Sequence, residues 1–461
     1  MDGIAEALAL VNTSRVIEDL TTLRSFGATY AGKWGNGVSR RGLSPEDIRA
    51  RYWISARMMA ANLRPAEVDG IGTVYGEGGD ADRPALLMGS HTDTQPEGGW
   101  LDGALGVVYA LEAARVLHAT NSPGAWAVID FSDEEGRFGT LVGSRSFAKV
   151  QSPPLDRMAG ARVAAGIAER PLLRWDRARA SPNAGWLGYL EAHIEQGPWL
   201  EAANASVGVV SSIVGMRQMR LRLWGRQGHA GGSPMAERAD AGLAAMRLAS
   251  GLDAALHAAC DGGACDGAVW TFPLLDGLIS HSTIPGAANL TFQFRAPSEP
   301  PLDLIEAAAR DHCDGARRAA LGLPPLSAAL PVECTIEPMR DPLPAVPMDA
   351  DMASCVDAAA HLAVDASPEE AGGGGVLTMP SRAIHDASPV ASVMPAAMLF
   401  VPSVGGVSHS FDEHTHEADV AVGARAFVAA AAGIVRRQCA ERSGRERDVP
   451  SVRAEREGSL E

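Results

Sequence analysis

The chain has 461 residues, of which 46% are hydrophobic and 21% charged, and its formal net charge at pH 7 is −16. A chain of this length is too long to fold around a single hydrophobic core, so we expect two domains. The composition is that of an ordinary globular protein. A strongly acidic chain repels phosphate backbones and anionic lipid headgroups, which argues against nucleic-acid and membrane partners.

Strands and helices alternate in the N-terminal part of the sequence. Residues 44–62, SPEDIRARYWISARMMAAN, predict a helix with Ser44 as N-cap and Asp47 placed for a capping box. The short apolar runs 85–90 (ALLMGS) and 126–132 (WAVIDFS) predict buried strands, each followed by a helical pattern. This order predicts an α/β domain with a central mixed, mostly parallel sheet flanked by helices. In such sheets ligands lie beyond the carboxyl ends of the strands.

A different pattern begins near residue 212. The run MRQMRLRLWG alternates apolar and charged residues like a half-buried strand, and LTFQFRAP is a second such run, followed by the helical pattern LDLIEAAARDHC. We therefore expect a smaller α+β domain at 212–329, a lid or dimerisation domain inserted into a catalytic domain made of 1–211 and 330–440. Residues 441–461 are charged and aperiodic, and we expect a disordered tail there.

The start of the chain and its cysteines bear on the compartment. The first residues lack the basic segment of a secretory signal, and no run of eighteen apolar residues predicts a membrane span. Six scattered cysteines show no metal-type spacing. We therefore expect reduced thiols, no disulfides and a cytoplasmic protein.

A glycine-rich stretch after the first apolar strand, GSHTDTQPEGGWLDG, carries the first candidate site residues. His91 and Asp102 are residue types that a hydrolytic metal site uses while leaving a position open for water. Asp93 is placed to orient the ring of His91, and the glycine turn at 98–99 allows Asp102 to fold back and bridge two cations. For each residue alone, a hydrogen-bonded loop position is the alternative.

Further acidic residues and histidines follow other apolar strands. Glu134 and Glu135 in DFSDEEGRFG predict a division of labour, in which one binds metal and the other takes a proton from the attacking water. A solvated acidic loop is the alternative for these two residues. His193 in HIEQGP and His409 in VGGVSHS also follow apolar runs.

Taken together, the sequence resembles the M20-type metal-dependent amidohydrolases, most closely the group of N-carbamoyl-L-amino acid hydrolases, β-ureidopropionases and allantoate amidohydrolases. The resemblance spans nearly the whole chain in order. Its motifs are GSHTDTQPEGGWLDGALGV, FSDEEGRFGTLVGS, EAHIEQGPWLE, GRQGHAGGSPMAERADA, TIPG followed by FQFR, and VPSVGGVSHS.

The resemblance implies two divalent metal ions per chain (Zn, Mn, Co or Ni) and a small-molecule substrate. One ion would be held by His91, Asp102 and His193, and the other by Asp102, Glu135 and His409. Glu134 would be the general base and then the acid, and Asp93 would orient His91. The resemblance also implies a homodimer.

Four further residues would act on the substrate. Gln196 would contact it, and Arg295 would hold its carboxylate. His229, from the small domain of a partner subunit, would polarise the scissile carbonyl, while Ser282 would lie beside the substrate.

The chain departs from the family where substrate would lie. Ser282 stands where the family usually has Asn, and Gln293 stands where it has Asp. In SRAIHDA, Arg382 and Ile384 replace glycines, so Arg382 would add positive charge to the substrate pocket. All metal and base positions are retained, so we expect the reaction type to be kept and the substrate to differ.

The resemblance implies hydrolysis of a linear C–N amide bond, most closely in an N-carbamoyl amino acid or a ureido acid such as allantoate, with release of ammonia and CO2. The alternatives are an M20-type aminoacylase or dipeptidase acting on another amide, and a catalytically silent, metal-stabilised binding protein.

Overall fold

The computed structural model describes residues 2–176, 178, 185–277, 281–367 and 374–447. The chain forms two compact units. Unit 1 comprises Met1–Ser211, Met348–Met379 and His385–Glu461, and unit 2 comprises Ser212–Pro347 and Pro380–Ile384. Unit 2 continues past the expected boundary at residue 329 because the strand Glu333–Pro338 pairs inside that unit.

The central sheet is mixed, as predicted, but it is not mostly parallel, because four of its described strand pairings are antiparallel and three are parallel. Its strand order is β1-β2-β4-β3-β5-β15-β6-β13, with β14 paired to β6. Strand β3 is parallel to β4 and β5, and β5 is parallel to β15, whereas β2 joins β4 antiparallel. The strands are β1 (Arg64–Val68), β2 (Val74–Gly79), β3 (Ala85–His91), β4 (Ala125–Phe131), β5 (Trp186–Ile194), β6 (Ala205–Ile213), β13 (Val346–Pro347), β14 (Gly375–Ser381) and β15 (Ala396–Val401).

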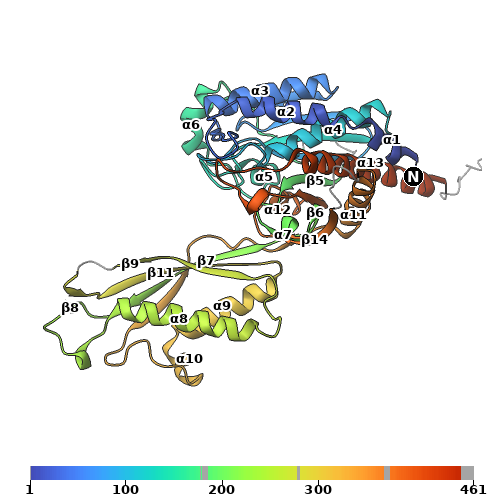
Figure 1. Ribbon diagram of the computed structural model, residues 1–461. Coiled ribbons are helices and arrows are strands. Elements are labelled where there is room, and N and C mark those ends of the chain that lie inside the picture. Colours follow the sequence, from blue (N-terminus) through green and yellow to red (C-terminus); the bar gives the residue numbers. More distant parts are fainter. Residues whose placement is uncertain (1, 177, 179–184, 278–280, 368–373, 448–461) are drawn as a thin grey trace, which may run out of the picture. The chain divides into compact units, whose positions relative to one another are not determined.

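Helices flank this sheet in unit 1 (Figure 1). Every residue of β3 and β4 is buried, which explains why both strands are continuous apolar runs in the sequence. The helices are α1 (Asp2–Leu10), α2 (Thr13–Ser25), α3 (Pro45–Ala60), α4 (Ala104–Ala119), α5 (Val142–Phe147), α6 (Leu155–Ala164), α7 (Trp199–Ala202), α11 (Ala350–Asp365), α12 (Ala387–Val390) and α13 (Glu417–Arg447).

Helix α3 begins as the sequence predicts, with one difference at its cap. The hydroxyl oxygen of Ser44 accepts a hydrogen bond from the main-chain amide of Asp47 at 3.2 Å. The Asp47 carboxylate does not complete a capping box with Ser44 but accepts the amide of Leu43 at 2.7 Å. Asp47 also pairs with Arg51 one turn later, so its carboxylate faces the interior.

Helix α13 is the last described element. Its segment Glu417–Arg436 is long and apolar enough to cross a membrane by composition, but 78% of the most apolar window is buried inside the protein, as in a core helix. The helix continues to Arg447, so the prediction of disorder from residue 441 is wrong for its first residues. The rest of the predicted tail, 448–461, lies outside the described residues.

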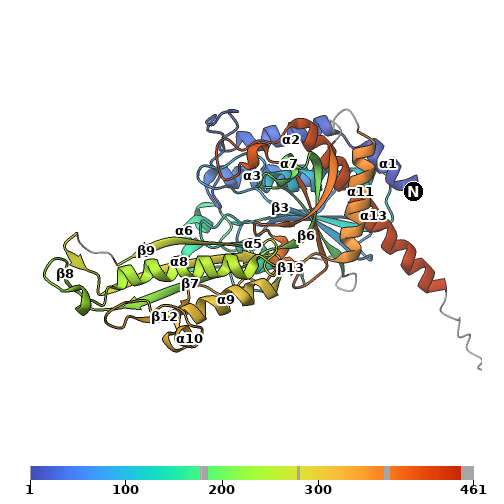
Figure 2. The same ribbon diagram turned by 60° about the horizontal axis from the view of Figure 1, so that its bottom comes forward.

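Unit 2 contains an antiparallel four-stranded sheet of order β12-β7-β11-β9, with α8 and α9 packed on one face (Figure 2). Alternate residues of β11 are buried, as expected of a strand with one polar face. A two-stranded ladder pairs β8 with β10. The elements are β7 (Gly215–Trp224), β8 (Gly228–His229), α8 (Ala241–Cys260), β9 (Val269–Asp276), β10 (Thr283–Ile284), β11 (Ala287–Ala296), α9 (Glu299–Cys313), α10 (Gly315–Ala320) and β12 (Glu333–Pro338).

The expectation that all cysteines are reduced is wrong. Unit 2 contains the disulfides Cys260–Cys265 and Cys313–Cys334, whereas Cys355 in unit 1 is not disulfide-bonded. Packing of the end of α9 near β12 brings Cys313 and Cys334 together, and a separation of 21 residues in sequence carries no signal of that contact. The cysteines therefore do not support a cytoplasmic location.

Candidate metal centre

The predicted site residues of unit 1 meet because the strands that precede them are neighbours. Strand β3 lies between β4 and β5 and runs parallel to both, so their carboxyl ends share one edge of the sheet. His91 ends β3, and His193 lies near the end of β5. Glu134 and Glu135 follow β4, and His409 follows β15, which is parallel to β5.

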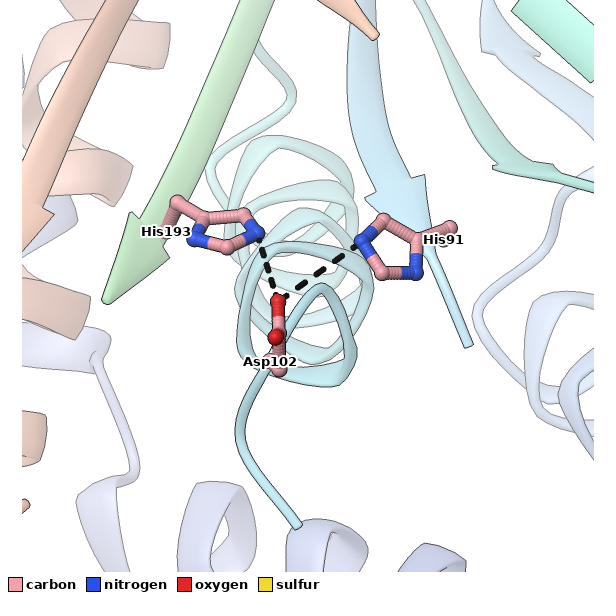
Figure 3. Close-up of side chains that lie close together, drawn as sticks. All are labelled: His91, Asp102 and His193. Atoms are coloured by element: carbon pink, nitrogen blue, oxygen red, sulfur yellow. Dashed lines mark ion pairs between the residues drawn. The ribbon is translucent and has the colours of Figure 1, made fainter. Parts of the chain in front are cut away.

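The first group of ligand-type atoms joins His91, Asp102 and His193, all of them buried. Figure 3 shows the two imidazole rings approaching one oxygen of Asp102 from two strands. The Oδ1 atom of Asp102 lies 3.1 Å from Nε2 of His193 and 3.9 Å from Nε2 of His91. Ligand atoms of all three residues lie within 4.8 Å of one another.

The second group joins Asp102, Glu135 and His409. The Oδ2 atom of Asp102 lies 3.2 Å from Nε2 of His409, and the same nitrogen lies 3.5 Å from Oε2 of Glu135. The imidazole of His409 is 51% exposed, so this group is open to solvent on one side. Asp102 thus belongs to both groups and turns one oxygen toward each.

Main-chain carbonyl groups orient two of the imidazoles. Nδ1 of His91 is hydrogen-bonded to the carbonyl oxygen of Asp93 at 3.0 Å, and Nδ1 of His193 to that of Ile194 at 2.9 Å. In each ring this leaves Nε2 directed at Asp102, the arrangement that metal-binding histidines require.

Asp93 was expected to orient His91, and its main-chain oxygen rather than its carboxylate contacts the ring. The carboxylate instead accepts the amides of Glu134 and Glu135, at 3.3 and 3.2 Å. Asp93 therefore contacts His91, Glu134 and Glu135, but none of these contacts involves an atom proposed to bind metal.

The turn before α4 depends on a glycine. Gly103 has φ +64°, and a Cβ atom there would overlap the imidazole ring of His91. The main-chain nitrogen of the same glycine lies 3.2 Å from Nε2 of His193. The close approach of Asp102 to both histidines therefore requires a residue without a side chain at position 103.

Burial and mutual charge shift the pKa values of the site carboxyls. Burial first, and then the neighbouring charges of Glu135 and Asp386, raise the pKa of Glu134 well above its usual value. Burial and the charge of Asp102 raise the pKa of Glu135 to about 8. Although burial disfavours the charged form of Asp102, its hydrogen bonds with His193 and His409 hold its pKa well below normal.

The pKa values of the three imidazoles depend on burial and on the same carboxylates. Burial lowers the pKa of His91 to about 3. For His193 burial acts in the same direction, but the hydrogen bond and charge of Asp102 outweigh it and raise the pKa to about 9. The hydrogen bond to Asp102 likewise raises the pKa of His409 to about 9. Without metal, Asp102 therefore favours the protonated form of two imidazoles, those of His193 and His409, but not that of His91.

Several side chains around the centre were not predicted from the sequence. Gln95 donates to Oε2 of Glu135 at 2.7 Å, and Glu413 accepts the amide of Asp102 at 3.0 Å. The buried ring of His385 lies 4.5 Å from that of His193, centroid to centroid. Gln95 and Glu413 stand four residues from predicted ligands, His91 and His409, and that proximity was the only signal for them.

The predicted substrate residues fall into both units. Gln196 lies in unit 1, and its amide donates to Oδ2 of Asp102 at 3.1 Å. The other four, His229, Ser282, Arg295 and Arg382, belong to unit 2.

Within unit 2 these four residues form two neighbouring pairs. His229 on β8 pairs with Thr283, the residue after Ser282, and Nδ1 of His229 accepts the amide of Gly232 at 2.9 Å. Arg295 on β11 donates to the carbonyl of Arg382 at 3.1 Å.

The fold and the paired His/carboxylate groups are those of a metallohydrolase, and comparison with known proteins agrees. The profile of peptidase family M20/M25/M40 matches residues 87–433, so the chain belongs to this family. Allantoate deiminase 2 of Glycine max is 32% identical over 88% of this chain and 87% of its own. The N-carbamoyl-L-amino-acid amidohydrolase of Paenarthrobacter aurescens is 30% identical over 90% of this chain and 96% of its own.

A solved structure supports the same fold. The crystal structure of an amidase of the hydantoinase/carbamoylase family from Burkholderia phymatum matches with a TM-score of 0.75 and 38% identity. The match covers 92% of this chain and 98% of that one. The large mixed sheet flanked by helices is therefore a fold that this chain shares with a family amidase.

Proposed function

We propose that this protein is a metal-dependent amidohydrolase that cleaves the linear C–N amide bond of N-carbamoyl amino acids or related ureido acids such as allantoate. The observation that carries the proposal is Asp102, whose two oxygens face two separate groups of ligand-type atoms. The names of the relatives, an allantoate deiminase and an N-carbamoyl-L-amino-acid amidohydrolase, support the choice of ureido substrates.

The donor set fits divalent metal ions. Three imidazoles and two carboxylates are borderline ligands for Zn, Mn, Co or Ni, and they leave room for substrate or water. His91, Asp102 and His193 would hold one ion, and Asp102, Glu135 and His409 the other. When bound, such ions act as Lewis acids that polarise a carbonyl group and increase the acidity of water.

Glu134 is the proton carrier in this proposal. Its carboxylate lies 3.8 Å from Nε2 of His91, beside the first group but outside the set of ligands. Burial and like charges raise the pKa of Glu134, so its carboxylate is a stronger base than an ordinary glutamate, as a group that takes a proton from water and returns it requires. Glu134 then returns this proton to the leaving amine nitrogen. From a ureido substrate the other product is carbamate, which decays to ammonia and CO2.

Residues of unit 2 would bind and polarise the substrate. As the family resemblance implies, His229 would stabilise the oxyanion and Arg295 would pair with the substrate carboxylate through its planar fork. Ser282 and Arg382, which differ from the usual family residues, would set the substrate preference, and Gln196 of unit 1 would contact the substrate. A homodimer in which the partner subunit supplies His229 belongs to the same proposal.

The test is ammonia release by metal-reconstituted protein from a panel of N-carbamoyl-L-amino acids, allantoate and ureidoglycolate. N-acetyl amino acids and dipeptides are followed in parallel by release of free amine. We expect ammonia from at least one ureido compound. Amine release from acyl compounds alone would contradict the proposal and favour an aminoacylase or dipeptidase, and silence on every substrate with both metals bound would favour a binding protein.

A further inference from the structure

Arg51 is a fully buried arginine on α3, behind the edge of the sheet that carries the metal centre. Its side chain forms ion pairs with three aspartates: Asp47 at 2.9 Å, Asp130 at 3.2 Å and Asp93 at 3.3 Å. It also donates to the main-chain oxygens of Gly72, Asp130 and Phe131. The guanidinium therefore connects α3 with the loop after β1 and with the carboxyl ends of β3 and β4.

The five N–H groups of this guanidinium all have acceptors. Nε donates to Asp47, and Nη1 to the carbonyl oxygens of Gly72 and Asp130. Nη2 donates to Oδ1 of Asp93 and to the carbonyl oxygen of Phe131. A planar fork of five fixed donors suits such a set, whereas an ammonium group has three donors at one point.

Asp93 connects Arg51 to the candidate centre. Its Oδ1 atom accepts both Nη2 of Arg51 and the amide of Glu134, and its Oδ2 atom accepts the amide of Glu135. Its main-chain oxygen contacts Nδ1 of His91 at 3.0 Å. One buried carboxylate thus links the guanidinium to the main chain of the proposed base and of one proposed ligand.

We propose that Arg51 is a positioning residue of this centre, which fixes Asp93 and thereby the main chain at Glu134 and Glu135 and the ring of His91. Among the described residues, the hydrogen bonds and ion pairs of Arg51 include no proposed ligand or base side chain, so it acts through Asp93 and through its hydrogen bonds to the main-chain oxygens of Asp130 and Phe131. Its effects on turnover and on metal affinity rest on the proposed function, whereas its effect on the 133–135 loop does not.

The test compares Arg51→Lys with Arg115→Lys as a matched control. Arg115 on α4 is also a mostly buried arginine of unit 1, with ion pairs to Asp19 at 2.8 Å and Glu112 at 3.3 Å. It lies eleven residues beyond the start of α4 at Ala104, about 16 Å along the helix axis, so its loss leaves the centre untouched. Both changes keep the positive charge but replace the planar guanidinium, which has five donors, with an ammonium group, which has three.

Amide hydrogen exchange of the segment 131–139 measures the positioning directly, with and without metal. For Arg51→Lys we expect faster exchange at Glu134 and Glu135, and metal affinity measured by calorimetry about 10–100-fold weaker, as for other outer partners of metal ligands. With an active substrate, kcat should fall by a similar factor of about 10–100 while KM changes by less than about threefold. Arg115→Lys should leave the exchange rates, the metal affinity and kcat within about twofold of the wild-type values, whatever its effect on thermal stability.

Two results would overturn the proposal. One is unchanged exchange at Glu134 and Glu135 in a folded Arg51→Lys protein. The other is a uniform loss of protection across unit 1, which would mean that Arg51 only stabilises the fold. If Arg51→Lys does not fold, Asp93→Asn, which keeps the side-chain shape, must show the same local increase in exchange. Because exchange and metal affinity need no substrate, they decide this proposal even if no ureido compound is hydrolysed.

Discussion

Glu413 fixes the main chain of Asp102, because its Oε1 atom accepts a hydrogen bond from the main-chain amide of Asp102 at 3.0 Å. The same oxygen accepts a hydrogen bond from the amide of Leu101. The hydroxyl of Ser408 lies 3.1 Å from Oε2 of Glu413 and 3.2 Å from Oδ2 of Asp102, so its single proton can be donated to either carboxylate. A Cβ atom on Gly99 would overlap the Glu413 carboxylate, so the glycine turn in the sequence makes room for this support.

Glu413→Ala should therefore weaken metal binding without removing a ligand. We expect about 10–100-fold lower affinity, since partners that orient ligands typically contribute this much. Glu413→Gln should retain more affinity than the alanine variant, because its amide oxygen can still accept both main-chain amides. Metal titration by calorimetry measures both variants, and equal affinities for wild type and Glu413→Ala would contradict the prediction.

The sharing of Asp102 predicts different metal losses for different ligand changes. Asp102→Ala removes a carboxylate from both groups, whereas Glu135→Gln removes one from the second group only. After dialysis against a weak chelator, we expect no stoichiometric metal on the first variant and about one ion per chain on the second, in keeping with a two-metal site. Elemental analysis gives these numbers, and retention of two ions by Asp102→Ala would refute the bridging role.

Glu134→Gln should abolish turnover while leaving metal bound. The change preserves the size of the side chain and removes only its capacity to take up a proton, so we expect kcat to fall on the order of 10²–10⁴-fold. Metal content should stay at the wild-type value because Glu134 belongs to neither ligand group. Steady-state ammonia release and elemental analysis on the same preparation test both halves, and a variant with near-normal kcat would exclude Glu134 as the base.

Local sequence signals pointed to the candidate ligands of unit 1 but not to the residues that orient them. His91 and His409 follow apolar strands, a position where ligand residues are common, and the family motifs then supplied their roles. Arg51 and Glu413 carry no such signal, since a charged residue in a helix or a loop is normally solvated and only tertiary packing shows that both are buried. The pairing of Cys313 with Cys334 was hidden for the same reason.

The metal-free protein should lose stability as pH rises above neutrality. The pKa values of His193 and His409 are raised to about 9, above the ordinary value of 6.5 that applies in the unfolded chain. Their contribution to the free energy of unfolding is therefore complete below pH 6.5 and is lost as pH rises toward 9. The pKa of Glu135, raised to about 8, acts in the same direction, because the folded state again binds more protons than the unfolded chain.

Thermal unfolding in excess chelator between pH 6.5 and 9.5 measures this dependence, and we expect the midpoint to fall steadily across that range. His409→Gln should flatten the decline, since it removes one of the titrating groups together with its partner charge for Asp102 and Glu135. Saturating divalent metal should raise the midpoint most at the alkaline end, where deprotonated imidazoles and carboxylates are free to act as ligands. A chelator-treated protein whose midpoint rises from pH 6.5 to 9 would contradict the assigned protonation of His193 and His409.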